Sequence, residues 1–141
     1  MVEGSGWLSV SSGGYSGSGC GGGFATHWIT SSTVDCCSVA YSTFTWRFST
    51  KLSSGSCQVS VYIPDGTTTE VGGHPARYTV YTGSGQSVGT FELDQRDNMG
   101  RWLPGGTFTD TGSSFEVQLD NQTSSGSHQV AASALKVSCS T

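Results

Sequence analysis

Apolar and polar residues alternate along much of this chain. Between Tyr41 and Ser49 the large rings fall on every second position, with threonine or arginine between them. The same period of two recurs in residues 57–63, 78–81 and 115–119, and stretches at 24–29, 88–93, 102–108 and 130–139 complete the set. A period of two places alternate side chains on opposite faces of a strand, so these stretches predict half-buried β-strands. No window repeats apolar residues at helical spacing for two turns, and little or no helix is expected.

Turn signals separate the predicted strands. They occur at residues 64–66 (Pro-Asp-Gly), 83–85 (Gly-Ser-Gly) and 97–100 (Asp-Asn-Met-Gly). About eight short strands joined by glycine-rich turns predict an all-β fold, an antiparallel β-sandwich of jelly-roll type. The sequence Pro104-Gly105-Gly106 predicts a bulge or bend within its strand. With 141 residues, the chain is expected to form one domain over residues 1–141.

Residues 1–40 differ in composition from the rest. Glycine and serine dominate the first part, but Trp7, Tyr15 and Cys20 interrupt it. A flexible linker would not ordinarily carry these residues. We therefore expect residues 1–40 to form an irregular Gly/Ser-rich lead-in that packs on the sandwich.

The predicted strands divide the aromatic residues into core and surface candidates. Those expected to face inward are Phe44, Trp46, Phe48, Phe91, Phe108 and Phe115. Trp102 is also interpreted as a packing residue, because large aromatic side chains dominate core energetics.

Five cysteines indicate disulfide bonds. Charged residues make up 11% of the chain, against about 25% in an average soluble protein. Cysteines in such a lysine-poor, hydroxyl-rich chain point to an oxidising compartment, and we expect an extracellular, secreted protein. Cys57 begins one predicted strand and Cys139 ends the last one, so antiparallel neighbours would bring them to bridging distance. Cys20 is then expected to pair with Cys37 or with Cys36, and one cysteine remains unpaired.

Charge and hydropathy exclude two classes of partner. The formal net charge is -4 and the basic residues are not clustered, so a phosphate backbone would meet no counter-charge and no nucleic-acid partner is expected. No stretch approaches the ~20 apolar residues of a membrane span. The first residues also lack a basic region followed by an apolar run, and Met1 is interpreted as an added start residue.

Several short sequence motifs together resemble those of a known family. They are Val61-Tyr62-Ile63-Pro64, Ala76-Arg77-Tyr78-Thr79-Val80-Tyr81, Asp94-Gln95, Gly100-Arg101-Trp102, Gly106-Thr107-Phe108 and the strand Val130 to Val137. In this combination, residues 41–137 resemble the golvesin C-terminal-like domain, also described as the carbohydrate-binding-like domain of xanthan lyase. Ser133 stands where the family usually has an acidic residue, so no role of that carboxylate is carried over. The resemblance implies a β-sandwich attached to secreted enzymes or surface proteins, with carbohydrate as its ligand.

Aromatic rings and nearby polar groups are the candidates for sugar contact. Trp7, Tyr15 and Trp28 lie in the lead-in, where variable loops tend to carry function. Asp94 and Gln95 could hydrogen-bond a sugar. The competing interpretation is that both end a strand and satisfy backbone donors in the turn that follows.

No cofactor is expected. A structural calcium ion is an alternative, with Asp65, Asp110 and Asp120 as loop carboxylates, but no spaced Asp-x-Asp run supports it and each fits a solvated turn.

Zinc and catalysis are also disfavoured. Adjacent Cys36 and Cys37 with His27 lack the C-x2-C spacing of a zinc site. The remaining histidines, His74 and His128, have no nucleophile elbow or paired glutamate near them in sequence. We therefore expect no enzyme activity from this chain.

The sequence thus predicts a non-catalytic accessory module of a secreted bacterial protein that binds a cell-surface or extracellular polysaccharide. A fused catalytic domain or another protein partner would then act on that polysaccharide. The alternative is a protein-interaction or assembly module of a secreted or surface complex, in which exposed rings and strand edges meet another polypeptide.

Overall fold

The structure is a computed structural model, and it describes the chain except for residues 1, 4–5, 18–19, 31–40, 51–53 and 124–126. The described residues form strands β1 (Val2–Glu3), β2 (Leu8–Val10), β3 (Phe24–Trp28), β4 (Thr43–Ser49), β5 (Gly55–Ile63), β6 (Ala76–Thr82), β7 (Ser87–Leu93), β8 (Arg101–Asp110), β9 (Ser114–Asp120), β10 (Gln129–Ala132) and β11 (Leu135–Ser140). They contain no helix, and hence none with the length and apolarity of a membrane span.

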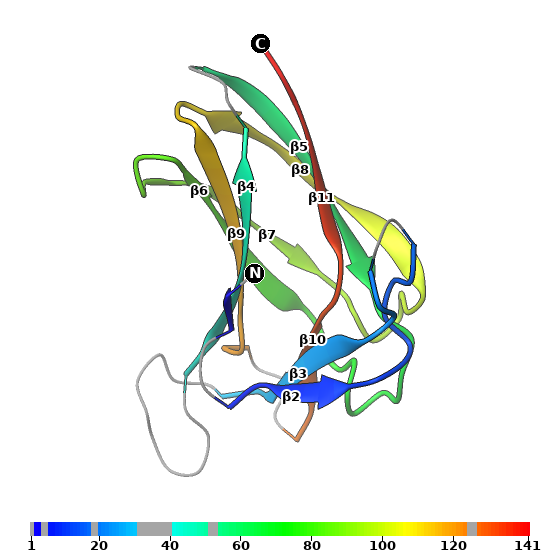
Figure 1. Cartoon of the computed structure of the whole chain (residues 1–141). Helices are drawn as coiled ribbons and strands as arrows, with labels where there is room; N and C mark the ends of the chain where they lie inside the picture. Colours follow the sequence, from blue (N-terminus) through cyan, green and yellow to red (C-terminus); the bar gives the residue numbers. More distant parts are fainter. Residues whose placement is uncertain (1, 4–5, 18–19, 31–40, 51–53, 124–126) are drawn as a thin grey trace.

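The strands form one five-stranded sheet and two three-stranded sheets. The five-stranded sheet has the order β1-β4-β9-β6-β7, and the three-stranded sheet across the core from it has the order β11-β5-β8 (Figure 1). A small sheet of order β10-β3-β2 lies at one end (Figure 1). All strand pairs within the sheets are antiparallel. The expected all-β antiparallel sandwich is therefore confirmed.

The core follows the period of two read from the sequence. On β9, Phe115, Val117 and Leu119 are completely buried, while the residues between them are partly exposed. The inward residues of β6, beside β9 in the same sheet, and of β5, in the facing sheet, complete the core. They are Cys57, Val59, Val61, Ile63, Ala76, Tyr78 and Val80. Burying alternate residues of facing strands is the usual source of stability in such a sandwich.

The predicted bulge is present in β8. Val59 pairs with Gly106 and Ser60 pairs with Pro104, which leaves Gly105 as the extra residue. A Cβ on Gly105 would lie 2.7 Å from the Phe91 ring, so the ring of β7 occupies the space that a side chain would need. A bulge bends the strand that carries it, and here it places the backbone of Gly105 against the Phe91 ring.

The predicted bridge between Cys57 and Cys139 is confirmed. These residues lie directly opposite each other in the pairing of β5 with β11, and their sulfur atoms are bonded. Cys20 is exposed and forms no disulfide with another described residue. Its predicted partners, Cys36 and Cys37, lie outside the described residues, so that second bridge stays a prediction.

The last predicted strand is divided in two. Its first part, β10, pairs with β3, and its second part, β11, pairs with β5. Ser133 lies at the break, where its carbonyl oxygen accepts a hydrogen bond from Trp46 Nε1 at 3.0 Å. Its hydroxyl accepts a hydrogen bond from the Tyr15 amide, also at 3.0 Å. The break therefore frees Ser133 to hold both the core and the lead-in.

The lead-in is more regular than expected. It supplies β1 to the edge of the five-stranded sheet, and it supplies β2 and β3 to the small sheet. Between β2 and β3 the chain folds back on the sandwich, where Asp65 N donates to the Gly13 carbonyl oxygen at 2.7 Å. Gly13 has φ of +101°, and a Cβ at this position would overlap the Asp65 carbonyl oxygen. Glycine is required here by both conformation and space.

Gly13→Ala is expected to loosen this part of the lead-in and to lower the free energy of unfolding by about 1–3 kcal/mol, through left-handed strain and the steric overlap. Limited proteolysis and urea denaturation would measure the two effects. Gly21→Ala is the matched control, because a Cβ on Gly21 meets nothing within 4 Å. Equal behaviour of the two variants would show that Gly13 does not fix the lead-in.

Candidate functional site

Three aromatic rings gather on the outer face of the β11-β5-β8 sheet. Tyr62 on β5 lies directly opposite Trp102 on β8, and their ring centroids are 5.5 Å apart. Val61 and Ile63, the neighbours of Tyr62, are buried, so the ring of Tyr62 faces outward. Tyr15 completes the group, at 5.3 Å from Tyr62 and 5.0 Å from Trp102. We call these three partly exposed rings the aromatic platform.

Short polar side chains extend from the platform along the same face. Strand register places Ser60, Gln58 and Ser56 of β5 next to Lys136, Ser138 and Ser140 of β11, and opposite Pro104, Thr107 and Thr109 of β8. Lys136 is exposed, and its Nζ lies 4.4 Å from the centroid of the Trp102 ring. The face therefore combines rings at one end with hydroxyl and amide groups beyond them.

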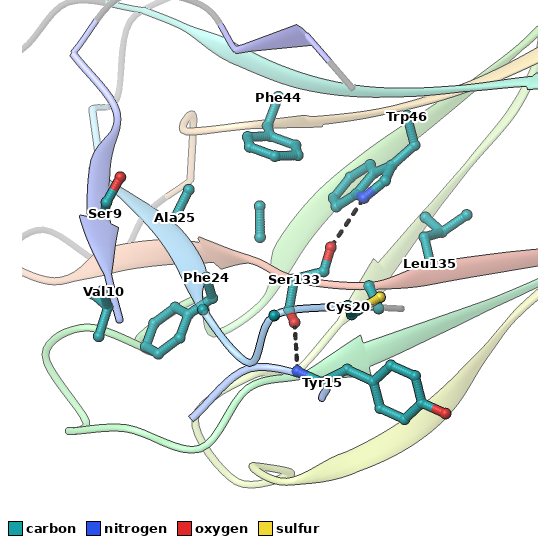
Figure 2. A pocket seen from close by; sticks show the side chains of 14 residues that line it. Ser9, Val10, Tyr15, Cys20, Phe24, Ala25, Phe44, Trp46, Ser133 and Leu135 are labelled. Atoms are coloured by element: carbon teal, nitrogen blue, oxygen red, sulfur yellow. Dashed lines mark hydrogen bonds between the residues drawn. The ribbon is translucent and has the colours of Figure 1, made fainter. Parts of the chain in front are cut away.

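The position of Tyr15 depends on the lead-in rather than on a strand. Its backbone amide is held by the Ser133 hydroxyl, and its ring extends away from Ser133 (Figure 2). Gly14 N donates to the Gly22 carbonyl oxygen at 2.8 Å, which closes the loop that carries Tyr15. Ser133 therefore positions Tyr15 for its contacts with Tyr62 and Trp102.

A cavity of about 530 Å³ has Ser133 among the residues that line it (Figure 2). It is lined by Ser9, Val10, Tyr15, Cys20, Gly21, Gly23, Phe24, Ala25, Phe44, Trp46, Ala132, Ser133, Ala134 and Leu135. Its walls are mostly apolar, and the indole N–H of Trp46 and the hydroxyl of Ser133 already have partners within the protein. With so few open polar groups, the cavity is less suited to a sugar than the platform is.

The other two predicted ligand rings lie away from the platform. Trp7 packs against His27 and Phe44, each at 5.3 Å, and its Nε1 donates to Ser42 Oγ at 3.0 Å. Trp7 therefore joins the lead-in to the sandwich. Trp28 is 42% exposed at the end of β3.

Gln95 has a structural role. It is completely buried, and its Nε2 donates to Tyr78 Oη at 2.9 Å and to the Ala131 carbonyl oxygen at 2.8 Å. Its Oε1 accepts from the Ala131 amide at 3.0 Å. Because every polar atom of the side chain already has a partner in the core, we leave Gln95 out of the candidate site.

Asp94 also serves the turn that follows it, as the competing interpretation expects. Its Oδ1 accepts from the Asp97 amide at 3.2 Å and lies 2.9 Å from His74 Nδ1. Partial burial acts to raise the pKa of Asp94, but hydrogen bonds from His74 and the Asp97 amide, with the positive charge of His74, lower it overall. A lowered pKa favours the folded state above the ordinary aspartate range, and this contribution is lost as the pH falls through the lowered pKa.

The same corner contains the one group of possible metal ligands found among the described residues. One ligand atom from each of His74, Asp94 and Asp97 lies within 4.8 Å of the others. Calcium prefers six to eight oxygen ligands, and this set offers two carboxylates and a nitrogen that is already bonded to one of them. The set fits calcium poorly.

Two other carboxylates considered for calcium are buried rather than solvated. Asp110 is completely buried and accepts hydrogen bonds from Thr50 at 2.5 Å and from Thr82 at 3.2 Å. Asp120 is 4% exposed and accepts from Arg77 Nε at 2.9 Å. The expectation that both sit in solvated turns is wrong, because each closes a polar network between strands.

Trp102 corrects the sequence interpretation as well. It was interpreted as a packing residue, and it does pack against the two tyrosines, but on the outer face and not in the core. Tyr62 could have been recognised as outward-facing, since it alternates with buried Val61 and Ile63. The outward position of Trp102 follows only from the β5–β8 register, which the bulge at Gly105 shifts by one residue.

Comparison with known proteins identifies one family. The Golvesin C-terminal domain matches residues 22–139, which extends the region of resemblance into β3. Neither the curated proteins nor the solved structures compared with this chain gave a match.

Proposed function

The chain belongs to the Golvesin C-terminal domain family, and we propose that it is an accessory module of a secreted protein that binds carbohydrate through its aromatic platform. In this role it does no chemistry itself and holds a partner domain or protein close to a polysaccharide. The single observation that supports this proposal is the gathering of Tyr15, Tyr62 and Trp102 on one outer sheet face.

The composition of that face suits a sugar. A pyranose has apolar C–H groups on its faces and hydroxyls around its rim, so it combines well with a ring beside polar groups. The platform supplies rings from β5, β8 and the lead-in, and the strands beyond supply hydroxyls and the Gln58 amide. The site is an open sheet face, which suits a polymer better than a small molecule.

An extracellular location agrees with the family and with the disulfide. The Cys57–Cys139 bond would persist in an oxidising compartment. Few charges and many hydroxyl side chains also suit a module that works beside hydrated polysaccharide.

Trp102→Ala and Tyr62→Ala are each expected to weaken glycan binding about tenfold, because each removes a ring from the centre of the proposed contact. Affinity gel electrophoresis with a panel of soluble polysaccharides would measure the retardation of each variant. Near-ultraviolet circular dichroism would check that both variants remain folded.

Trp28→Ala is the matched control, since it removes an exposed tryptophan from a different sheet. Its retardation should equal that of the unmodified protein. If Trp28→Ala abolishes retardation and Trp102→Ala leaves it unchanged, the platform is not the site. If no glycan retards the protein, carbohydrate binding itself is refuted.

A protein-interaction module is the second candidate, and exposed apolar side chains favour it. Leu8 is 50% exposed and Trp28 is 42% exposed. Leu8 lies opposite Thr26, so Leu8 and Trp28 are diagonal neighbours on one face of the small sheet. A co-purifying polypeptide that is lost with Leu8→Ser, in a protein that no glycan retards, would favour this candidate over the first.

A further inference from the structure

We infer that the platform selects glycans that carry anionic substituents, with Lys136 as the residue that recognises the charge. This inference rests on the proposed carbohydrate-binding function and specifies its ligand class. It is drawn from the distribution of charge over the outer face of β11-β5-β8 and from the position of Lys136 on Trp102.

The outward residues of β11, β5 and β8 carry a single formal charge among them, and it is positive. They are Ser56, Gln58, Ser60, Tyr62, Trp102, Pro104, Thr107, Thr109, Lys136, Ser138 and Ser140. The chain contains ten acidic residues, and none of the outward positions of these three strands is acidic. Near the Tyr15 end, Asp65 follows β5 and Arg101 begins β8, and these two charges are opposite in sign.

Of the other four described cations, two pair with carboxylates and Arg96 donates to the Gly72 carbonyl oxygen, whereas Arg101 at the start of β8 has no ion pair with a described residue. Arg47 pairs with Glu116, and Arg77 pairs with Asp120 at 2.9 Å. Lys136 differs from both, because its recorded partner is the neutral ring of Trp102. Its charge is therefore not cancelled by a carboxylate of the described chain and can meet one on a ligand.

The location of Lys136 also implies an exchange of partners. A sugar that stacks on the exposed side of Trp102 needs the surface that the ammonium group covers. A neutral sugar would displace the Lys136 ammonium group from the Trp102 ring without offering it a charged partner in exchange. An anionic sugar offers the ammonium group a stronger partner beside the ring, because a charge-assisted hydrogen bond is stronger than an exposed cation–π contact.

The overall charge of the chain makes the prediction selective. A net charge of -4 opposes non-specific attraction to a polyanion. At physiological ionic strength, screening confines charge interactions to roughly 8 Å, so the local ammonium group decides the interaction. A preference for an anionic glycan would then arise from Lys136 on this face and not from the net charge of the whole molecule.

The test is affinity electrophoresis on pairs of polysaccharides that share a backbone. The pairs are hydroxyethylcellulose with carboxymethylcellulose, methyl-esterified pectin with polygalacturonate, and dextran with dextran sulfate. The first two anionic members carry carboxylates and the third carries sulfates, so they separate the two sources of charge. Lys136→Met removes the charge, Lys136→Arg keeps it, and Arg47→Met is a control that removes a cation from the five-stranded sheet.

We expect the anionic member of a recognised pair to retard the unmodified protein more strongly. Lys136→Met should weaken this binding by about three- to tenfold, and should leave the neutral member equal or up to about threefold tighter because the ring is uncovered. Lys136→Arg should keep the preference because it keeps the positive charge, and Arg47→Met should keep it because Arg47 lies on another sheet. Higher salt should reduce the anionic preference alone.

Two results would overturn the inference while carbohydrate binding stands. One is equal retardation by neutral and anionic members of a recognised pair. The other is an anionic preference that survives Lys136→Met. Retardation by no member of any pair would instead count against the proposed function itself.

Discussion

Replacement of both Cys57 and Cys139 with alanine is expected to lower the free energy of unfolding by about 4 kcal/mol. The bond joins residues separated by 82 positions, so it closes most of the chain into one loop in the unfolded state. It also fixes the register between β5 and β11, the two strands that carry Tyr62 and Lys136. Urea denaturation of the oxidised protein and of the double variant would measure the difference.

Ser138→Ala serves as the control for this experiment, because it changes an exposed neighbour of Cys139 without touching the bond. Its denaturation midpoint should match that of the unmodified protein. A double cysteine variant with an unchanged midpoint would show that noncovalent packing alone holds β11 in place.

Gln95→Ala is expected to cost about 3–5 kcal/mol of stability, through a cavity and the loss of hydrogen bonds to buried groups. The Gln95 side chain joins Tyr78 on β6 to both backbone polar groups of Ala131 on β10. Burial raises the pKa of Tyr78 well above its ordinary value, and the Gln95 hydrogen bond opposes this rise only in part. The phenol therefore stays neutral, and its oxygen would be left without this donor.

Gln95→Met separates the effect of the cavity from the effect of the lost hydrogen bonds, since methionine keeps most of the volume but offers no amide. Gln58→Ala is the matched control, because Gln58 is exposed on the outer face of β5. Thermal and urea denaturation would rank the three variants. If Gln95→Ala remained as stable as Gln58→Ala and instead lost glycan binding, Gln95 would be a ligand residue after all.

Gln95 and Asp94 show why a short sequence motif does not determine the role of each residue in it. Both follow β7 and form one of the motifs that resemble the family, and both are residue types that bind sugars. In the fold, one side chain enters the core and the other accepts a bond from the next turn. The direction taken by each side chain after a strand ends depends on neighbours far away in sequence, such as Ala131 and His74.

Tyr15 and Trp102 show the same limit for aromatic residues. Tyr15 was a predicted ligand ring and Trp102 a predicted core ring, yet the structure brings them to 5.0 Å. Their meeting requires the lead-in to fold back through Gly13 and Ser133, and it requires β8 to shift its register at Gly105. Neither requirement is visible in the alternation of residues along one strand.

The sequence by itself determined most of the strands, the sandwich and the bond between Cys57 and Cys139. These features follow from local rules, because side chains alternate along a strand and antiparallel neighbours bring strand ends together. Only the tertiary structure decided which rings and which charge share an outer face. That choice depends on register between strands and on the docking of the lead-in, and a shift of one residue would turn Trp102 from the platform toward the core.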